Sequence, residues 1–157
     1  MPALREVLTG GGLHEVRTYV QSGNVVLSAD DSPTELADRV HRLIAEGFGL
    51  DIAVVVRTRD ELAEVVARNP LADVAVNPKR YQVTFLDDEL DAATLDKLAA
   101  LALPDERFVA IGRELYAWHP DGVGRSKLWP ALAKRKSATA RNWTTVTQLL
   151  AMADDVG

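Results

Sequence analysis

The chain has 157 residues, of which 47% are hydrophobic and 26% are charged, and its formal net charge is −5. This balance is typical of a globular protein with one domain, or with two small ones that share a core. The absence of cysteine excludes disulfides, thiolate metal sites and a cysteine nucleophile. No apolar run approaches the roughly 18 residues of a membrane span, and no signal peptide begins the chain, so we expect a cytoplasmic protein.

The chain opens with a predicted helix and a predicted pair of strands. Residues 2–8 have helical composition and are followed by three glycines at 10–12, which accept the geometry of a helix C-terminus. Residues 16–19 and 24–27 then predict two strands joined by a turn at 21–24, where glycine and asparagine tolerate positive φ.

A longer helix and a buried strand are predicted next. Ser32 is the expected N-cap, with Pro33 in the first helical position, and apolar residues recur at helical spacing as far as Ile44. Residues 52–56 form a continuous apolar run, mostly β-branched, which predicts a buried strand. Residues 60–67 predict a further helix.

The second half repeats this rhythm of strand, helix and hairpin, and it ends in two helices. The predicted strand is 81–86, the helix 90–101, the hairpin 108–111 with 114–118, and the closing helices lie between 126 and 134 and from about 142 to 152.

The order of these elements predicts the fold class. Strand, helix, hairpin, helix and strand follow one another in a ferredoxin-like unit. We therefore expect an α+β protein of two tandem ferredoxin-like α/β sandwich halves with C-terminal helices, packed as one compact unit. The segment from Asn69 to Pro78 contains two prolines and predicts the boundary between the halves, 1–69 and 79–157. The first half lacks an opening strand, because the chain begins directly in a helix.

Three motifs, in this order along the chain, resemble those of the uncharacterised bacterial family DUF1697. They occupy residues 18–26, 124–128 and 139–146. The resemblance implies a cytoplasmic α+β protein with two ferredoxin-like halves, and it implies no established activity.

The chain departs from this family pattern at its N-terminus. Family members usually carry an apolar strand and a glycine-rich turn ahead of the segment that matches residues 1–8. We therefore expect either a start codon placed too late or a truncated variant. A truncated first sheet would leave unpaired N–H and C=O groups, so lower stability or pairing with a second copy is expected in that case.

The strongest functional indication is the charge of the C-terminal region. Residues 122–153 contain six Lys and Arg residues and no Asp or Glu, so the rest of a chain with net charge −5 sums to −11. A protein divided in this way has a basic face that suits an anionic ligand.

Arg141 is the residue for which the hypothesis of anion binding is most specific. If Thr139 is the N-cap of the last helix, Arg141 lies in the first turn, where the helix dipole disfavours a cation by about 0.3–1 kcal/mol. An anion held by backbone N–H groups, the Thr139 hydroxyl and the Arg141 guanidinium would explain this position. The alternative is that Arg141 pairs with a carboxylate of the chain and that Asn142 is the N-cap.

Further candidate residues lie near Gly124, in the first predicted turn and among the histidines. Arg125, Ser126 and Lys127 follow Gly124 and supply cationic and hydroxyl donors, although they do not form a phosphate-binding loop. Ser22 is a turn hydroxyl by default and is kept as a contact because it lies in a family motif. The three histidines show no metal-ligand spacing, so no metal or cofactor is predicted, and an acid–base role for His119 is a minor alternative.

These observations predict a protein that binds a small phosphate- or carboxylate-bearing ligand in a C-terminal basic pocket. An enzyme acting on such a ligand with an unidentified base, or a module that interacts with protein or nucleic acid, is the alternative. A pI near 5.2 and 6% aromatic residues make nucleic acid an improbable partner. The predicted ligand-binding residues are Arg125, Ser126, Lys127, Thr139, Arg141, Asn142 and Ser22.

Overall fold

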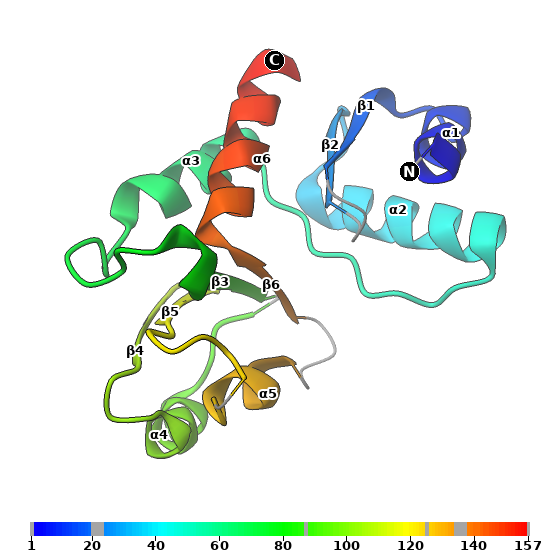
Figure 1. The fold of residues 1–157 in the computed structure, drawn as a ribbon. Coiled ribbons are helices and arrows are strands. Elements are labelled where there is room, and N and C mark those ends of the chain that lie inside the picture. The colour runs from blue at the N-terminus through cyan, green and yellow to red at the C-terminus, as the bar shows by residue number, and fades with distance from the viewer. Residues whose placement is uncertain (1, 20–23, 87, 125, 134–137, 157) are drawn as a thin grey trace. The chain divides into compact units, whose positions relative to one another are not determined.

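The computed structural model describes residues 2–19, 24–86, 88–124, 126–133 and 138–156 (Figure 1). The described helices are α1 (Pro2–Gly10), α2 (Pro33–Phe48), α3 (Arg59–Arg68), α4 (Ala92–Leu101), α5 (Leu128–Ala133) and α6 (Trp143–Val156), with a 3-10 helix η1 at Pro78–Arg80. The described strands are β1 (His14–Tyr19), β2 (Asn24–Ser28), β3 (Tyr81–Leu86), β4 (Arg107–Ile111), β5 (Glu114–Trp118) and β6 (Ala138–Asn142). The protein is therefore an α+β protein with two antiparallel sheets.

The chain forms two compact units. The first unit comprises Met1–Ala63 and Thr147–Gly157, and the second unit comprises Glu64–Val146. This division follows internal contacts and differs from the sequence boundary between 1–69 and 79–157, which stays a prediction.

The first unit is built around the β1–β2 hairpin and the helices α1 and α2 (Figure 1). Ser32 caps α2 as expected, because the Glu35 backbone N–H donates to the Ser32 hydroxyl at 3.2 Å. Gly49 ends the helix in the left-handed conformation. The buried apolar core consists of Leu4, Leu8, Leu13, Val16 and Val40.

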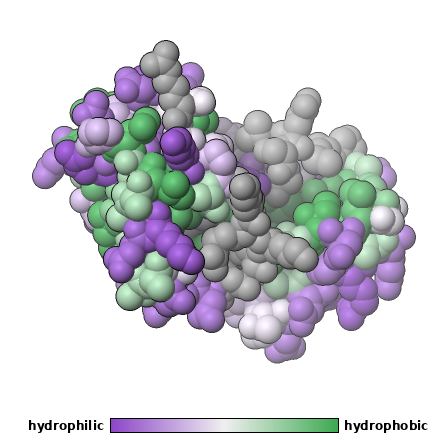
Figure 2. Space-filling view, turned by 90° about the horizontal axis from the view of Figure 1, so that it is seen from below, coloured by the Kyte–Doolittle hydropathy of each residue, from purple (hydrophilic) through white to green (hydrophobic). Residues whose placement is uncertain are grey.

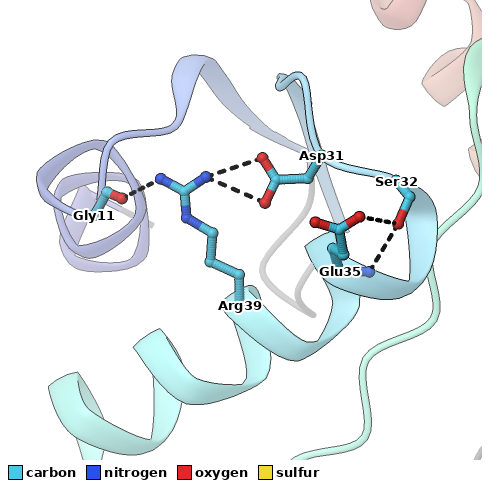
Figure 3. Close-up of polar contacts among 5 residues, drawn as sticks. All are labelled: Gly11, Asp31, Ser32, Glu35 and Arg39. Atoms are coloured by element: carbon cyan, nitrogen blue, oxygen red, sulfur yellow. Dashed lines mark hydrogen bonds and ion pairs between the residues drawn. The ribbon is translucent and has the colours of Figure 1, made fainter.

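Arg39 joins three parts of this unit (Figure 3). From α2, its guanidinium donates to the Gly11 carbonyl oxygen at 2.5 Å and to an Asp31 carboxylate oxygen at 3.1 Å. A Cβ added to Gly12 would lie 2.7 Å from the Arg39 Nη2 atom, and Gly12 has a φ of +91°. The positive φ favours glycine at position 12, and an added side chain would also displace the end of the Arg39 side chain.

The strand predicted for residues 52–56 was wrong. Residues 49–58 have no regular secondary structure, and Ile52 is 47% exposed, although Val54 packs against the core of the first unit. A β-branched run becomes a strand only where a neighbouring strand takes its N–H and C=O groups. The described sheet of this unit contains β1 and β2 alone, and residues 52–56 pair with neither.

The second unit contains a four-stranded antiparallel sheet with the order β4-β5-β3-β6. The helices α4 and α5 lie on one side of this sheet (Figure 1), and their side chains pack on Leu115 and Ala117 of β5. On the opposite face, Tyr116 donates a hydrogen bond of 2.7 Å to the Val65 carbonyl oxygen, and the ring of Tyr81 stacks on Trp143 at 4.9 Å. Both faces are therefore covered where β3 and β5 meet.

Hydrophobic patches (green) lie among hydrophilic residues (purple) on the face shown in Figure 2. The exposed large hydrophobic side chains of the described residues are Phe48, Leu50, Ile52, Val74 and Val76. They come from two short segments, and none belongs to the predicted ligand site.

Candidate functional site

The stretch that was expected to open the last helix is the edge strand β6. It pairs with β3 in antiparallel register, with Thr139 opposite Phe85 and Arg141 opposite Val83. Thr139 is therefore not an N-cap, and that prediction was wrong. The alternative N-cap is confirmed, because the Thr145 backbone N–H donates to the Asn142 side-chain oxygen at 2.9 Å and α6 begins at Trp143.

Arg141 and Thr139 lie on one face of the sheet. Residues directly opposite each other in an antiparallel pair share a face, so both side chains lie on the face that carries Tyr81 and Tyr116. The Arg141 guanidinium is half-buried and donates to the Ala140 carbonyl oxygen at 2.8 Å. Burial lowers the pKa of Arg141 from its ordinary value, because a desolvated guanidinium is a less favourable cation.

Ser126 and Lys127 belong to the other side of the sheet. Ser126 is buried and caps α5, because its hydroxyl accepts a hydrogen bond of 3.0 Å from the Trp129 backbone N–H. The helix that follows packs Leu128 and Leu132 against Leu115 and Ala117, on the face opposite Arg141. The structure therefore does not bring Ser126 and Lys127 onto the face of Thr139 and Arg141. Arg125 and Ser22 lie outside the described residues, and a ligand role for them stays a prediction.

A buried polar cluster, which the sequence did not predict, lies beside α5. The His119 Nδ1 atom is 2.5 Å from a Glu106 carboxylate oxygen, and both side chains are almost completely buried. The same carboxylate accepts a hydrogen bond of 2.8 Å from the Leu103 backbone N–H and a further one from the Ser126 hydroxyl. We call Glu106, His119 and Ser126 the Glu–His–Ser cluster.

The surroundings of Glu106 favour the ionised form of its carboxyl group. Burial alone raises the pKa of the Glu106 carboxyl, but the hydrogen bonds from Leu103, His119 and Ser126 outweigh it and hold that pKa below its usual range. An ionised carboxylate only accepts hydrogen bonds, so the His119 Nδ1 atom must carry the proton that lies between them. In a neutral imidazole, Nε2 is then a hydrogen-bond acceptor. It is buried, and no described residue is its partner.

The cluster could have been anticipated in part. The hairpin pairs Arg107 with Trp118 and Ile111 with Glu114, and one further step of the same register sets residue 106 opposite residue 119. The predicted hairpin therefore already implied that Glu106 and His119 are neighbours. The burial of this cluster beneath α5 and the hydrogen bond from Ser126 depend on tertiary packing, which leaves no local pattern in the sequence.

Two kinds of feature are absent from the described residues. They include no group of three or more His, Asp or Glu side chains arranged to hold a metal ion. No helix among them is both long enough and apolar enough to cross a membrane.

Comparison with known proteins found a matching family model and a solved structure of similar fold. A family model described as "Protein of unknown function (DUF1697)" matches residues 1–116. The structure of the conserved bacterial protein SP0830 from Streptococcus pneumoniae is similar, with a TM-score of 0.72 and 20% identity over 98% of this chain and 88% of that chain. At this identity the likeness shows the fold alone. No curated protein matches the chain.

Proposed function

Because the chain belongs to the DUF1697 family, whose function is unknown, we propose a function from its own residues: it binds a small anionic ligand at Arg141 and Thr139. The ligand carries a phosphate or a carboxylate group. The site contains Thr139 and Arg141 from the predicted basic pocket. Ser126 is not part of it, because its hydroxyl caps α5.

The observation that carries this proposal is the half-buried position of the Arg141 guanidinium on a sheet face. Two opposite unit charges 4 Å apart attract by about 1 kcal/mol in water and by about 4 kcal/mol at an effective dielectric constant of 20. The interaction energy of an anion with a partly desolvated guanidinium is therefore more favourable than with an exposed one. The planar guanidinium also suits the two oxygens of a carboxylate or a phosphate.

The surroundings of Arg141 support an anion. Thr139 lies on the same face two residues away, which is about 7 Å along a strand, so its hydroxyl and the guanidinium are within reach of one ligand. Glu114 lies on this face two strands away and is paired with Arg68 at 2.7 Å. The charge of that carboxylate is therefore compensated.

We expect Arg141→Ala to weaken ligand binding about tenfold to a hundredfold, because a hydrogen bond to a charged group contributes about 1.5–3 kcal/mol. The measurement is a thermal-shift screen with inorganic phosphate, sugar phosphates and dicarboxylates, followed by calorimetry on any hit. A ligand at a hundred times its dissociation constant stabilises the protein by about 2.7 kcal/mol.

Arg107→Ala is the matched control. Arg107 is exposed and lies on the same face, on the edge strand farthest from β6. Its replacement removes an equal charge and should leave binding unchanged. Equal loss of binding in both variants would indicate a general charge effect, and unchanged binding in Arg141→Ala would refute the site.

An enzyme is the second candidate, and the Glu–His–Ser cluster is the observation that favours it. Glu106 orients His119 in the way that a carboxylate orients a general base, with Nε2 as the accepting atom. The His119 side chain is completely buried, so a substrate would reach Nε2 only after the region around α5 opened. This candidate requires turnover that His119→Asn abolishes in a folded protein. A ligand that binds without turnover argues against it.

We infer further that the second unit is a ferredoxin-like sandwich. The element order β3-α4-β4-β5-α5-β6 supports this assignment, since it follows the pattern β-α-β-β-α-β of that fold. The first unit supplies only the middle of this pattern, α1-β1-β2-α2. The expectation of two complete tandem halves therefore remains a proposal.

A further inference from the structure

We infer that α5 (Leu128–Ala133) is a lid over the His119 side chain, and that this helix opens locally while the sheet beneath it stays folded. Opening gives a molecule from solvent access to the Nε2 atom of His119, which is completely buried when the helix is in place. The inference rests on the enzyme candidate for what this access serves. The opening itself is measured without turnover, so the two can fail separately.

The Nε2 atom of His119 is the group that opening exposes. The Nδ1 atom carries the proton of its hydrogen bond to Glu106, so Nε2 is left as an acceptor, and no described residue donates to it. A buried acceptor without a donor raises the free energy of the folded state. An O–H or N–H group of a small molecule that reaches Nε2 would remove this cost. The closed state is therefore disfavoured at this atom, and the open state can bind a hydrogen-bond donor there.

The helix α5 depends on its contacts with the rest of the second unit. It has six residues, and helices this short are not stable alone in water. Leu128 and Leu132 are buried in the core that also contains side chains of β5, and the Trp129 ring meets the His119 ring edge-on, with the ring centroids 6.0 Å apart. Loss of these contacts would therefore unfold the helix and uncover His119 in one step.

A single hydroxyl group fastens this helix to the buried polar cluster. The Ser126 hydroxyl accepts a hydrogen bond of 3.0 Å from the Trp129 backbone N–H and donates one to the Glu106 carboxylate. It thus joins the first turn of α5 to the carboxylate that holds His119. Ser126→Ala removes both hydrogen bonds and keeps the apolar contacts of the helix, so it should favour the open state.

His119 belongs to the sheet and not to the lid. Its backbone N–H donates to the Arg80 carbonyl oxygen at 3.1 Å, one step beyond the paired residues Tyr81 and Trp118. The pairings of β4 with β5, of β5 with β3 and of β3 with β6 involve no residue of α5. The helix can therefore leave without breaking a strand pair, and the histidine stays in its place.

The test is the rate at which diethyl pyrocarbonate modifies each histidine of the full chain near neutral pH, followed by peptide mass spectrometry. This reagent acylates an accessible neutral imidazole nitrogen. In the wild type, His119 should react more slowly than His14, which is exposed and serves as an internal reference. Ser126→Ala should raise the His119 rate about tenfold, because two hydrogen bonds of the closed state are lost, and it should leave the His14 rate unchanged.

Ser32→Ala is the matched control, because it removes the N-cap hydroxyl of α2 in the first unit. It should not change the His119 rate. Low concentrations of urea provide a second readout: the His119 rate should rise less steeply with urea than global unfolding does, since a local opening exposes less surface.

Three outcomes would overturn the lid: equal reactivity of His119 and His14 in the wild type, an unchanged His119 rate in Ser126→Ala, or the urea dependence of global unfolding. Equal acceleration of His119 by Ser32→Ala would overturn it as well, because the exposure would then be global. Faster modification in Ser126→Ala, in a protein that shows no turnover, would support the lid and refute only the enzyme candidate.

Discussion

Glu106→Ala is expected to lower the free energy of unfolding by about 3–5 kcal/mol, because several buried donors lose a charged acceptor and each unsatisfied buried group costs about 1–3 kcal/mol. The Glu106 carboxylate accepts hydrogen bonds from Leu103, His119 and Ser126. Its removal leaves all three donors in a buried place without their acceptor. Urea unfolding followed by circular dichroism measures the change as a lower midpoint at an unchanged slope.

Asp105→Ala is the control for this experiment. Asp105 is the exposed neighbour of Glu106, and its replacement should change stability by less than about 0.5 kcal/mol. A loss below about 1 kcal/mol in Glu106→Ala would mean that the cluster is open to water or readily rearranges.

The same carboxylate predicts a pH dependence. The folded-state pKa of Glu106 lies below its unfolded value of about 4.3, so its contribution is complete above that pH. As the pH falls from about 4.3 towards the folded-state pKa, the unfolded chain takes up the proton first and stability is lost. Glu106→Gln cannot titrate at this position. The wild type should therefore lose more stability than Glu106→Gln over this range, and parallel pH curves would contradict the prediction.

Leu8→Ala and Leu115→Ala are each expected to lower the free energy of unfolding by about 2–5 kcal/mol, because both side chains are fully buried. The two core clusters draw their residues from different units, Leu8 from the first and Leu115 from the second. Native-state hydrogen exchange should therefore show faster exchange mainly in α1 and α2 for Leu8→Ala, and in β3 and β5 for Leu115→Ala.

Leu50→Ala serves as the control, since Leu50 is 50% exposed and its truncation should cost less than about 0.5 kcal/mol. Equal acceleration throughout the chain in both core variants would show that the units unfold together. That result would remove the basis for treating their cores as separate.

The elements predicted correctly from sequence are those with strong local signals. Ser32 and Pro33 mark the start of α2, and the hairpin turn at Gly112 carries a positive φ of 58°. These features depend on residues within one or two turns of chain. Local chemistry was therefore sufficient to place them.

The two wrong segments depend on partners far away in the chain. Residues 52–56 are rich in β-branched side chains and yet form no strand, whereas Ala138–Asn142 contains two alanines and an arginine and forms β6. The state of each is decided by whether a strand lies beside it, and β6 pairs with β3 about fifty residues earlier. Intrinsic propensity is too weak to overcome that difference.

Some contacts of the candidate site could likewise be predicted from the sequence, and others could not. The helix-cap role of Asn142 was one of two alternatives drawn from sequence, and the structure selects it. The pairing of Glu106 with His119 was implicit in the predicted hairpin register. The separation of Ser126 from Arg141 was not accessible, because it depends on which sheet face α5 covers.

The position of β3 at the centre of its sheet has a consequence for synthesis on the ribosome. Both of its partners, β5 and β6, come later in the chain, and all its residues except Gln82 are buried in the finished sheet. During N-to-C synthesis, β3 therefore emerges before any strand that can pair with it. Until Glu114–Trp118 and then Ala138–Asn142 follow, the nascent chain carries an apolar strand with both edges open, the kind of segment that chaperones bind and that aggregates when they do not.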